Sequence, residues 1–101
     1  MNSSAFGMLG ILNRAGFVLF GPGTEKALRK GALLLLALDA SPRTKKEYEG
    51  PANALRLPIF YVSSKQELGS PLGRDELSAA LITSKKGAKS LLEKLMKGEP
   101  S

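Results

Sequence analysis

The chain has 101 residues, 43% of them hydrophobic, and it contains neither cysteine nor histidine. This length and composition predict a single domain over residues 1–101, and the missing residue types exclude disulfides, most zinc sites and most nucleophile–base pairs. Fifteen basic residues against nine acidic ones give a formal net charge of +6, which favours an anionic partner such as nucleic acid.

The first predicted element is a helix at the N-terminus. Its apolar residues recur at helical spacing, and they are Ala5, Met8, Leu9 and Leu12. Ser4 is the candidate N-cap, and Gly16 is the candidate left-handed stop. No basic region precedes this segment, so we expect an amphipathic helix and not a signal peptide. The longest apolar run, 32–38, is too short to span a bilayer, so we expect a soluble cytoplasmic protein with no membrane partner.

Strands and a glycine turn follow. Residues 17–20 predict a strand, residues 21–24 predict a turn, and a short helix around Ala27 and Leu28 is expected to stop at Gly31. Residues 32–38 are all apolar, which predicts a central strand covered on both of its faces.

The middle of the chain predicts a helix with a possible interruption. Ser41 and Pro42 supply an N-cap and a first-turn proline. The helix is expected either to end near Glu49 or to restart with Pro51 as a new first turn. The residues expected to face the core there are Ala52 and Leu55.

The last third predicts two more strands and two more helices. Residues 58–62 and 77–83 predict the strands. Ser64 and Glu67 form a capping box for a helix of about two turns, which Gly69 and Gly73 limit. Ser84 caps the last helix, whose apolar stripe is Ala88, Leu91, Leu92, Leu95 and Met96 and whose end is set by Gly98 and Pro100. We expect disorder over 98–101. The alternation of helices and strands predicts a layered α/β domain.

The glycine turn, 21–26, is the first candidate binding site. Glycines between a strand and a helix let backbone amides approach an anion, and Lys26 would neutralise a phosphate. Three interpretations fit the pattern: a contact with RNA, a dinucleotide site completed by Asp39 at the end of the next strand, or a turn whose glycines only set φ.

Three other charged clusters are visible. The last helix carries Lys85, Lys86, Lys89, Lys94 and Lys97, for which a solvated face is the simpler interpretation and an outside anion the alternative. Arg43, Lys45 and Lys46 predict a surface helix. Arg74 is placed to reach a phosphate or a base edge. The adjacent Asp75 and Glu76 are more typical of exposed solubilising groups than of a metal site, so we predict no metal, no cofactor and no enzyme activity.

Several segments resemble the ribosomal protein L7Ae family. They are EKALRKG (25–31), LLLLALDASPRTKK (33–46) and LPIFYVSSKQELGSPLG (57–73), in the order that this family shows. NRAGFVLFG (13–21) is similar to the start of its small bacterial, YlxQ-like ribosome-associated members. The resemblance extends from about Phe6 to Leu95. It implies a three-layer α/β/α sandwich around a four-stranded mixed sheet.

The resemblance also implies a function. Members of this family typically bind kink-turn RNA, in which the N-terminus of the second helix contacts sheared G·A pairs and a loop after the fourth helix covers the kink. Carried over by position, the RNA-binding residues are Gly21, Gly23, Thr24, Glu25, Lys26, Arg29, Leu72, Gly73 and Arg74. We therefore expect a non-catalytic, monomeric, ribosome-associated protein that binds a kink-turn or other ribosomal RNA, with Thr24 or Glu25 reading a base edge.

Two alternatives remain open. The best-known RNA binders of the family have an Asn-Glu pair shortly before the lysine, where this chain has Pro22 and Gly23, or Gly23 and Thr24. The first alternative is therefore a protein-interaction module of the same fold that has lost kink-turn recognition and uses Leu72 and Leu77. The second is a small-nucleotide binder that uses the glycine turn with Asp39.

Overall fold

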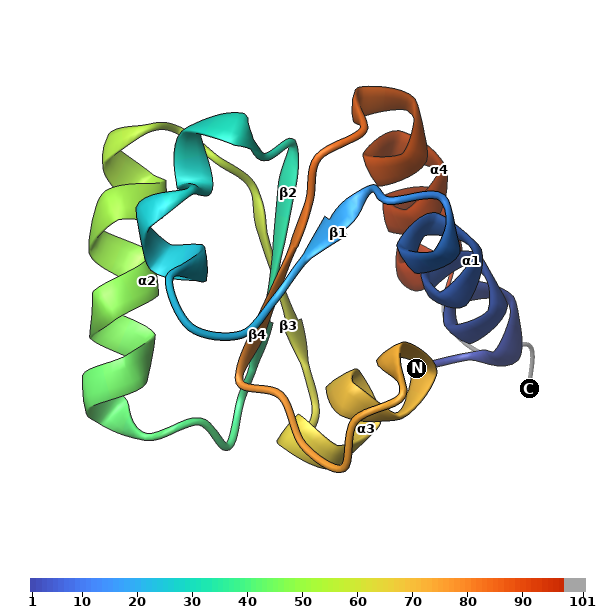
Figure 1. Ribbon diagram of the computed structural model, residues 1–101, viewed down its shortest axis with the longest axis horizontal. Helices are drawn as coiled ribbons and strands as arrows, with labels where there is room; N and C mark the ends of the chain where they lie inside the picture. The colour runs from blue at the N-terminus through green and yellow to red at the C-terminus, as the bar shows by residue number, and fades with distance from the viewer. Residues whose placement is uncertain (98–101) are drawn as a thin grey trace.

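The computed structural model describes residues 1–97, and helices cover both faces of a central sheet (Figure 1). The helices are α1 (Ser3–Arg14), α2 (Pro42–Ala54), α3 (Lys65–Gly69) and α4 (Lys85–Met96). The strands are β1 (Val18–Leu19), β2 (Leu33–Ala37), β3 (Ile59–Val62) and β4 (Ala79–Ile82), and the 3-10 turns are η1 (Thr24–Lys26), η2 (Leu28–Lys30) and η3 (Ser70–Leu72). The predicted α/β/α sandwich is confirmed. The predictions for Gly98, Pro100 and 98–101 lie outside the described residues.

The sheet has the strand order β1-β4-β2-β3. β2 and β3 are parallel, and α2 makes the crossover that a parallel pair requires. β4 is antiparallel to both of its neighbours. Leu33 pairs with Ile82 and Leu36 with Ala79, so the end of β2 lies beside the start of β4.

β2 is the centre of the core. All five of its residues are buried, because α1, α3 and α4 cover one face of the sheet while α2, η1 and η2 cover the other (Figure 1). Alternate side chains of a strand point to opposite faces. Leu33 and Leu35 pack with α1 and α4, whereas Leu34 and Leu36 pack with α2. The prediction from the continuous apolar run, a central strand covered on both faces, is therefore confirmed.

A side-chain oxygen caps the N-terminus of each of the four α-helices in residues 1–97. The predicted serine caps are confirmed, each accepting a hydrogen bond from the amide three residues further on at 3.0–3.2 Å, and they are Ser41, Ser64 and Ser84. Asn2, not Ser4, caps α1, because its side-chain oxygen accepts from the amide of Ala5 at 2.8 Å. The Asn2 side chain also donates to the carbonyl of Lys94 at 2.8 Å, which ties the start of α1 to the end of α4.

α2 runs unbroken through Pro51, so neither predicted interruption occurs. Proline removes its own amide donor and crowds the carbonyl four residues back, but the amide of Leu55 still donates to the Pro51 carbonyl at 3.1 Å. Ala52, fully buried against the sheet, holds this last turn in place.

Two residues predicted for the core are exposed. Leu55 is 44% exposed, because the left-handed Arg56 at φ +56° turns the chain so that Leu57 packs instead. Met96 is 71% exposed, because Leu95 takes the last buried position of α4. In both cases the helical spacing of apolar residues continues past the last residue that packs on the sheet, so the pattern alone predicted burial for one residue too many.

The two glycines near α3 act differently. Gly73 has a φ of +74° and ends η3 in the left-handed conformation, as predicted. Gly69 keeps a helical φ of −71°, and η3 follows it directly. Its role is close packing, because a Cβ at Gly69 would lie 2.8 Å from the carbonyl oxygen of Arg74 and 3.0 Å from the Cα of Glu76. The absent side chain lets residues 74–76 return across α3.

We predict that Gly69→Ala lowers the free energy of unfolding by about 1–3 kcal/mol, because the new methyl group meets loop backbone and not a flexible side chain. Gly50→Ala is the matched control, since Gly50 also lies in a helix and its added Cβ would meet no atom within 4 Å. We expect that control to be stabilised by up to about 1 kcal/mol. Urea unfolding measures both changes, and equal changes in the two variants would contradict the packing role.

Candidate nucleic-acid interface

Two glycines with positive φ shape the turn between β1 and η1. Gly21 at +93° and Gly23 at +88° adopt a conformation that strains residues with a side chain. The carbonyl oxygen of Gly21 accepts hydrogen bonds from the amide of Thr24 at 3.3 Å and from its hydroxyl at 2.7 Å. The Thr24 side chain, only 4% exposed, therefore closes the turn from the inside.

The residues after this turn form η1 and η2, not the predicted α-helix. Their hydrogen bonds join residues three apart, as from the amide of Lys26 to the carbonyl of Gly23 at 3.0 Å. A 3-10 turn rises about 2.0 Å per residue, against about 1.5 Å in an α-helix. The few residues before β2 therefore reach from the end of β1 to the other end of the sheet, with Leu28 buried on the way.

The predicted residues of this segment separate into two groups. Thr24 is structural, which corrects the expectation that it reads a base edge, because its hydroxyl is buried and donates to Gly21. Lys26 and Arg29 are exposed, and Glu25 is partly exposed. Among the predicted side chains of this segment, these three are open to solvent.

The loop after α3 lies beside the glycine turn. The guanidinium of Arg74 sits over the ring of Phe20, 5.3 Å from its centroid, and so joins the loop to the end of β1. A hollow of about 370 Å³ lies between the two segments and α2, lined by residues within 21–25, 44–48 and 76–79. The two segments that were predicted to act together are thus neighbours in space.

Leu72 does not belong to this surface. It is only 5% exposed and packs in the core below α1, which corrects the expectation that it contacts RNA. The protein-interaction alternative relied on Leu72 and Leu77, and the burial of Leu72 leaves it only Leu77. Leu77 is partly buried at the edge of the hollow, while Gly73 and Arg74 are exposed.

Sequence reasoning missed the wall that α2 contributes. Tyr48 is buried there, and its pKa is raised by burial first and then by the carboxylates of Glu25 and Glu47, while the hydroxyl of Thr24 acts in the opposite direction. Glu76 brings a third carboxylate to the same hollow. The hollow therefore accepts hydrogen bonds and repels phosphates. The sequence contains a pattern that indicates this wall, because Thr44, Tyr48 and Ala52 are spaced four residues apart and so share one face of a helix.

The geometry contradicts the dinucleotide interpretation. In that fold the glycine turn joins two neighbouring parallel strands, whereas here β4 lies between β1 and β2. Asp39 has another role, since its carboxylate accepts a hydrogen bond from the amide of Lys65 at 2.7 Å at the start of α3.

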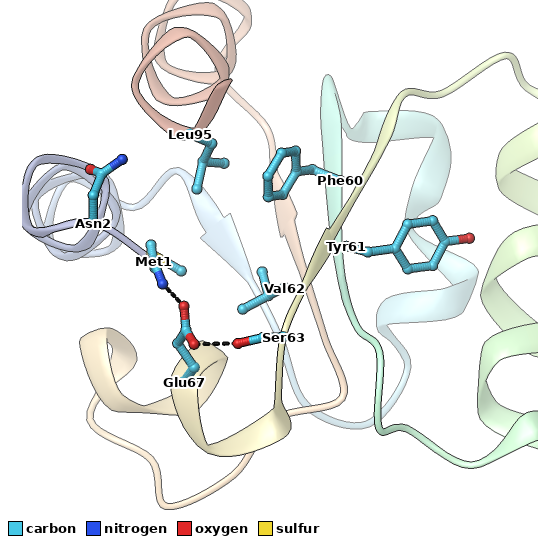
Figure 2. A pocket seen from close by; sticks show the side chains of 8 residues that line it. All are labelled: Met1, Asn2, Phe60, Tyr61, Val62, Ser63, Glu67 and Leu95. Carbon is cyan, nitrogen blue, oxygen red and sulfur yellow. Dashed lines mark hydrogen bonds and ion pairs between the residues drawn. The ribbon is translucent and has the colours of Figure 1, made fainter. Parts of the chain in front are cut away.

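A second hollow, of about 250 Å³, lies on the other face of the sheet between β3, α4 and the start of α1 (Figure 2). Phe60 points into this space, while the ring of the adjacent Tyr61 points away from it. Glu67 accepts a hydrogen bond from the Ser63 hydroxyl and pairs with the Met1 ammonium group. Its carboxylate therefore does not complete the predicted capping box with Ser64.

Within residues 1–97, no three carboxylates gather in a way that would hold a metal ion. None of the helices in that range combines the length and the apolar character needed to cross a bilayer.

Comparisons with known proteins agree with this fold. A sequence model of the ribosomal protein L7Ae/L30e/S12e/Gadd45 family matches residues 24–93. A protein of Halalkalibacterium halodurans, named "RNA-binding protein BH0128", is 38% identical over 65 residues, which cover 62% of this chain and 78% of that protein. A solved structure, "The structure of a protein with unknown function from Bacillus halodurans C", superposes with a TM-score of 0.79 at 22% identity, covering 91% of this chain and 96% of that one.

We predict that Thr24→Val lowers the free energy of unfolding by about 1–2 kcal/mol, because the Gly21 carbonyl loses its side-chain donor. Thr83→Val is the control, since Thr83 is partly exposed and its backbone amide makes the bond to the Phe17 carbonyl. We expect the control to change by less than about 0.5 kcal/mol. Urea unfolding separates the two cases, and an equal loss in both would rule out the closing role of the hydroxyl.

The raised pKa of Tyr48 predicts a loss of stability at high pH. The unfolded tyrosine ionises near its ordinary pKa of 10.0, while the folded one stays neutral to higher pH. The contribution is therefore complete below pH 10 and is lost as the pH rises through the folded pKa. In urea unfolding between pH 8 and strongly alkaline pH, the wild type should lose stability relative to Tyr48→Phe only above pH 10. A difference that is constant across this range would contradict the burial effect.

Proposed function

Because this chain belongs to the ribosomal protein L7Ae/L30e/S12e/Gadd45 family, we propose that it binds structured RNA through the glycine turn and the loop beside it, without catalysing a reaction. The name of the similar Halalkalibacterium halodurans protein supports the choice of RNA as the ligand. The excess of basic residues supports an anionic partner in the same way.

The observation that carries the proposal is the meeting of two separate segments at one surface. Arg74 lies over Phe20, and the hollow draws its lining from both segments and from α2. Neither segment makes this surface alone. A kink-turn or another folded ribosomal RNA element presents unpaired bases beside its phosphates, which suits this surface better than a straight duplex does.

The charges suggest which chemical groups of such an RNA each part of the site would contact. Lys26, Arg29 and Arg74 are exposed cations for phosphates. Glu25 lies at the hollow, where its carboxylate would accept a hydrogen bond from the amino group of an unpaired base. Gly21 and Gly23 carry no side chains, so that a sugar or base approaches the backbone closely at these two positions. We propose that the protein acts as a monomer in the cytoplasm, bound to ribosomal RNA or to the ribosome.

The test is a titration of a standard kink-turn RNA against a matched straight duplex at two salt concentrations. We expect the kink-turn to bind at least about tenfold more tightly, a difference of about 1.4 kcal/mol. Equal weak binding of both RNAs that disappears at high salt would leave only general electrostatic attraction and would reject the proposal.

Two variants assign the roles. Lys26→Ala should reduce the slope of log affinity against log salt by about one unit for both RNAs. Glu25→Ala should weaken the kink-turn by about tenfold and leave the duplex unchanged. Lys97→Ala, an exposed lysine of the described chain far from this surface along α4, is the control. A Glu25→Ala variant that weakens both RNAs equally would contradict base reading.

A further inference from the structure

A lysine-rimmed groove lies at the start of α4, on the seam between α4 and the segments that enter β2 and the edge strand β3. The groove measures about 390 Å³, and its apolar lining is Ala32, Leu33, Pro58, Ala88 and Leu92. The two charged residues in its lining are Lys85 and Lys89. Among residues 1–97, no acidic, aromatic or hydroxyl side chain lines it.

The two groove lysines form no ion pair within the described chain. The ion pairs of residues 1–97 are Met1–Glu67 and Arg43–Glu47, so neither groove lysine has an acidic partner there. The first turn of α4 contains Lys85 and Lys86 and no acidic residue. The helix dipole makes positive charge unfavourable at that position by a few tenths of a kcal/mol. Lys85 therefore does not serve the stability of its own helix, whereas Lys89 lies one turn before Glu93.

The seam continues beyond the groove. The hollow of Figure 2 lies further along the same two elements, and there Leu95 of α4 and Phe60 of β3 face the same space. β3 is an edge strand, since β2 is its one neighbour within residues 1–97. Positive charge thus stands at one end of the seam. The hollow at its other end combines Phe60 and Leu95 with the polar side chains of Asn2, Ser63 and Glu67.

This seam is separate from the proposed RNA site. The groove contains Leu33, which packs on the α1 and α4 face, whereas the RNA hollow contains Tyr48, which packs on the α2 face. Leu33 pairs with Ile82, while the RNA hollow contains Ala79 at the opposite end of β4. The two surfaces therefore lie on opposite faces and at opposite ends of the sheet.

We propose that this seam docks an acidic segment of a partner protein, whose apolar side chain enters the groove while its carboxylates pair with Lys85 and Lys89. The charge of the rim requires an anionic partner, and the apolar lining requires an apolar anchor. RNA fits less well, because the groove offers no aromatic surface for a base to stack on and no hydrogen-bonding side chain besides the lysines. The protein would then hold RNA and a protein partner at the same time.

The test selects random twelve-residue peptides displayed on phage against the immobilised full-length chain. Enriched peptides are synthesised and titrated by fluorescence anisotropy against the wild type, Lys85→Glu/Lys89→Glu and the control Lys94→Glu/Lys97→Glu. The control changes the net charge by the same amount on the same helix. A third variant, Leu92→Gln, keeps a similar volume but makes the groove polar.

We expect enriched peptides to combine acidic residues with a leucine, isoleucine or phenylalanine. Their affinity should fall at least about tenfold with Lys85→Glu/Lys89→Glu, about fivefold with Leu92→Gln and less than about twofold with the control. Glu at position 85 suits the helix dipole, so the melting temperature of the first variant should not fall. The variant would lose peptide binding and keep its fold. If these lysines had only a structural role, their replacement would lower the melting temperature instead.

Three results would overturn the proposal. They are selection of peptides without acidic residues, enriched peptides that bind the Lys85→Glu/Lys89→Glu variant as tightly as the wild type, and no enrichment at all.

The kink-turn titration is repeated with the same variant, and its affinity for the RNA should stay within about threefold of the wild type. Loss of RNA binding without acidic peptides would assign the seam to RNA. Failure of the kink-turn titration in the wild type leaves the peptide result intact.

Discussion

The burial of four consecutive leucines on both faces of β2 is the constraint on which the rest of the structure depends. Leu33 to Leu36 are each at most 1% exposed, and a fully buried leucine contributes about 1.5–3 kcal/mol. Together they are comparable to the whole net stability of a small domain, about 5–15 kcal/mol. Both faces of the strand must therefore be covered by helices, and both of its edges must be paired.

The candidate RNA surface follows from that pairing. β3 takes one edge of β2, and β4 takes the other, so that β4 separates β1 from β2. The end of β1 and the chain entering β4 are consequently neighbours, which brings Arg74 over Phe20. The core thus decides which loops meet, while the buried Thr24 hydroxyl keeps the glycine turn in shape.

The excess of positive charge is not spread evenly over the molecule. Glu25, Glu47 and Glu76 surround the hollow beside the glycine turn, whereas Lys85 and Lys89 stand at the opposite end of the sheet with no acidic residue in their groove. A net charge of +6 therefore describes two different surfaces. Carboxylates line the first of these surfaces, whereas two lysines and apolar side chains line the second.

The sequence by itself determined the elements that depend on local chemistry and short-range pattern. The serine caps of α2, α3 and α4 and the covered run of β2 were predicted correctly because neighbouring residues decide them, whereas the predicted cap Ser4 was wrong. The resemblance to a known family supplied the sandwich. Only the tertiary structure decided the burial of Leu72 and Thr24, the 3-10 form of η1 and η2, the exposure of Leu55 and Met96, and the packing role of Gly69. Each of these depends on which distant segment lies opposite, and spacing along the chain carries no information about a neighbour that only folding brings into contact.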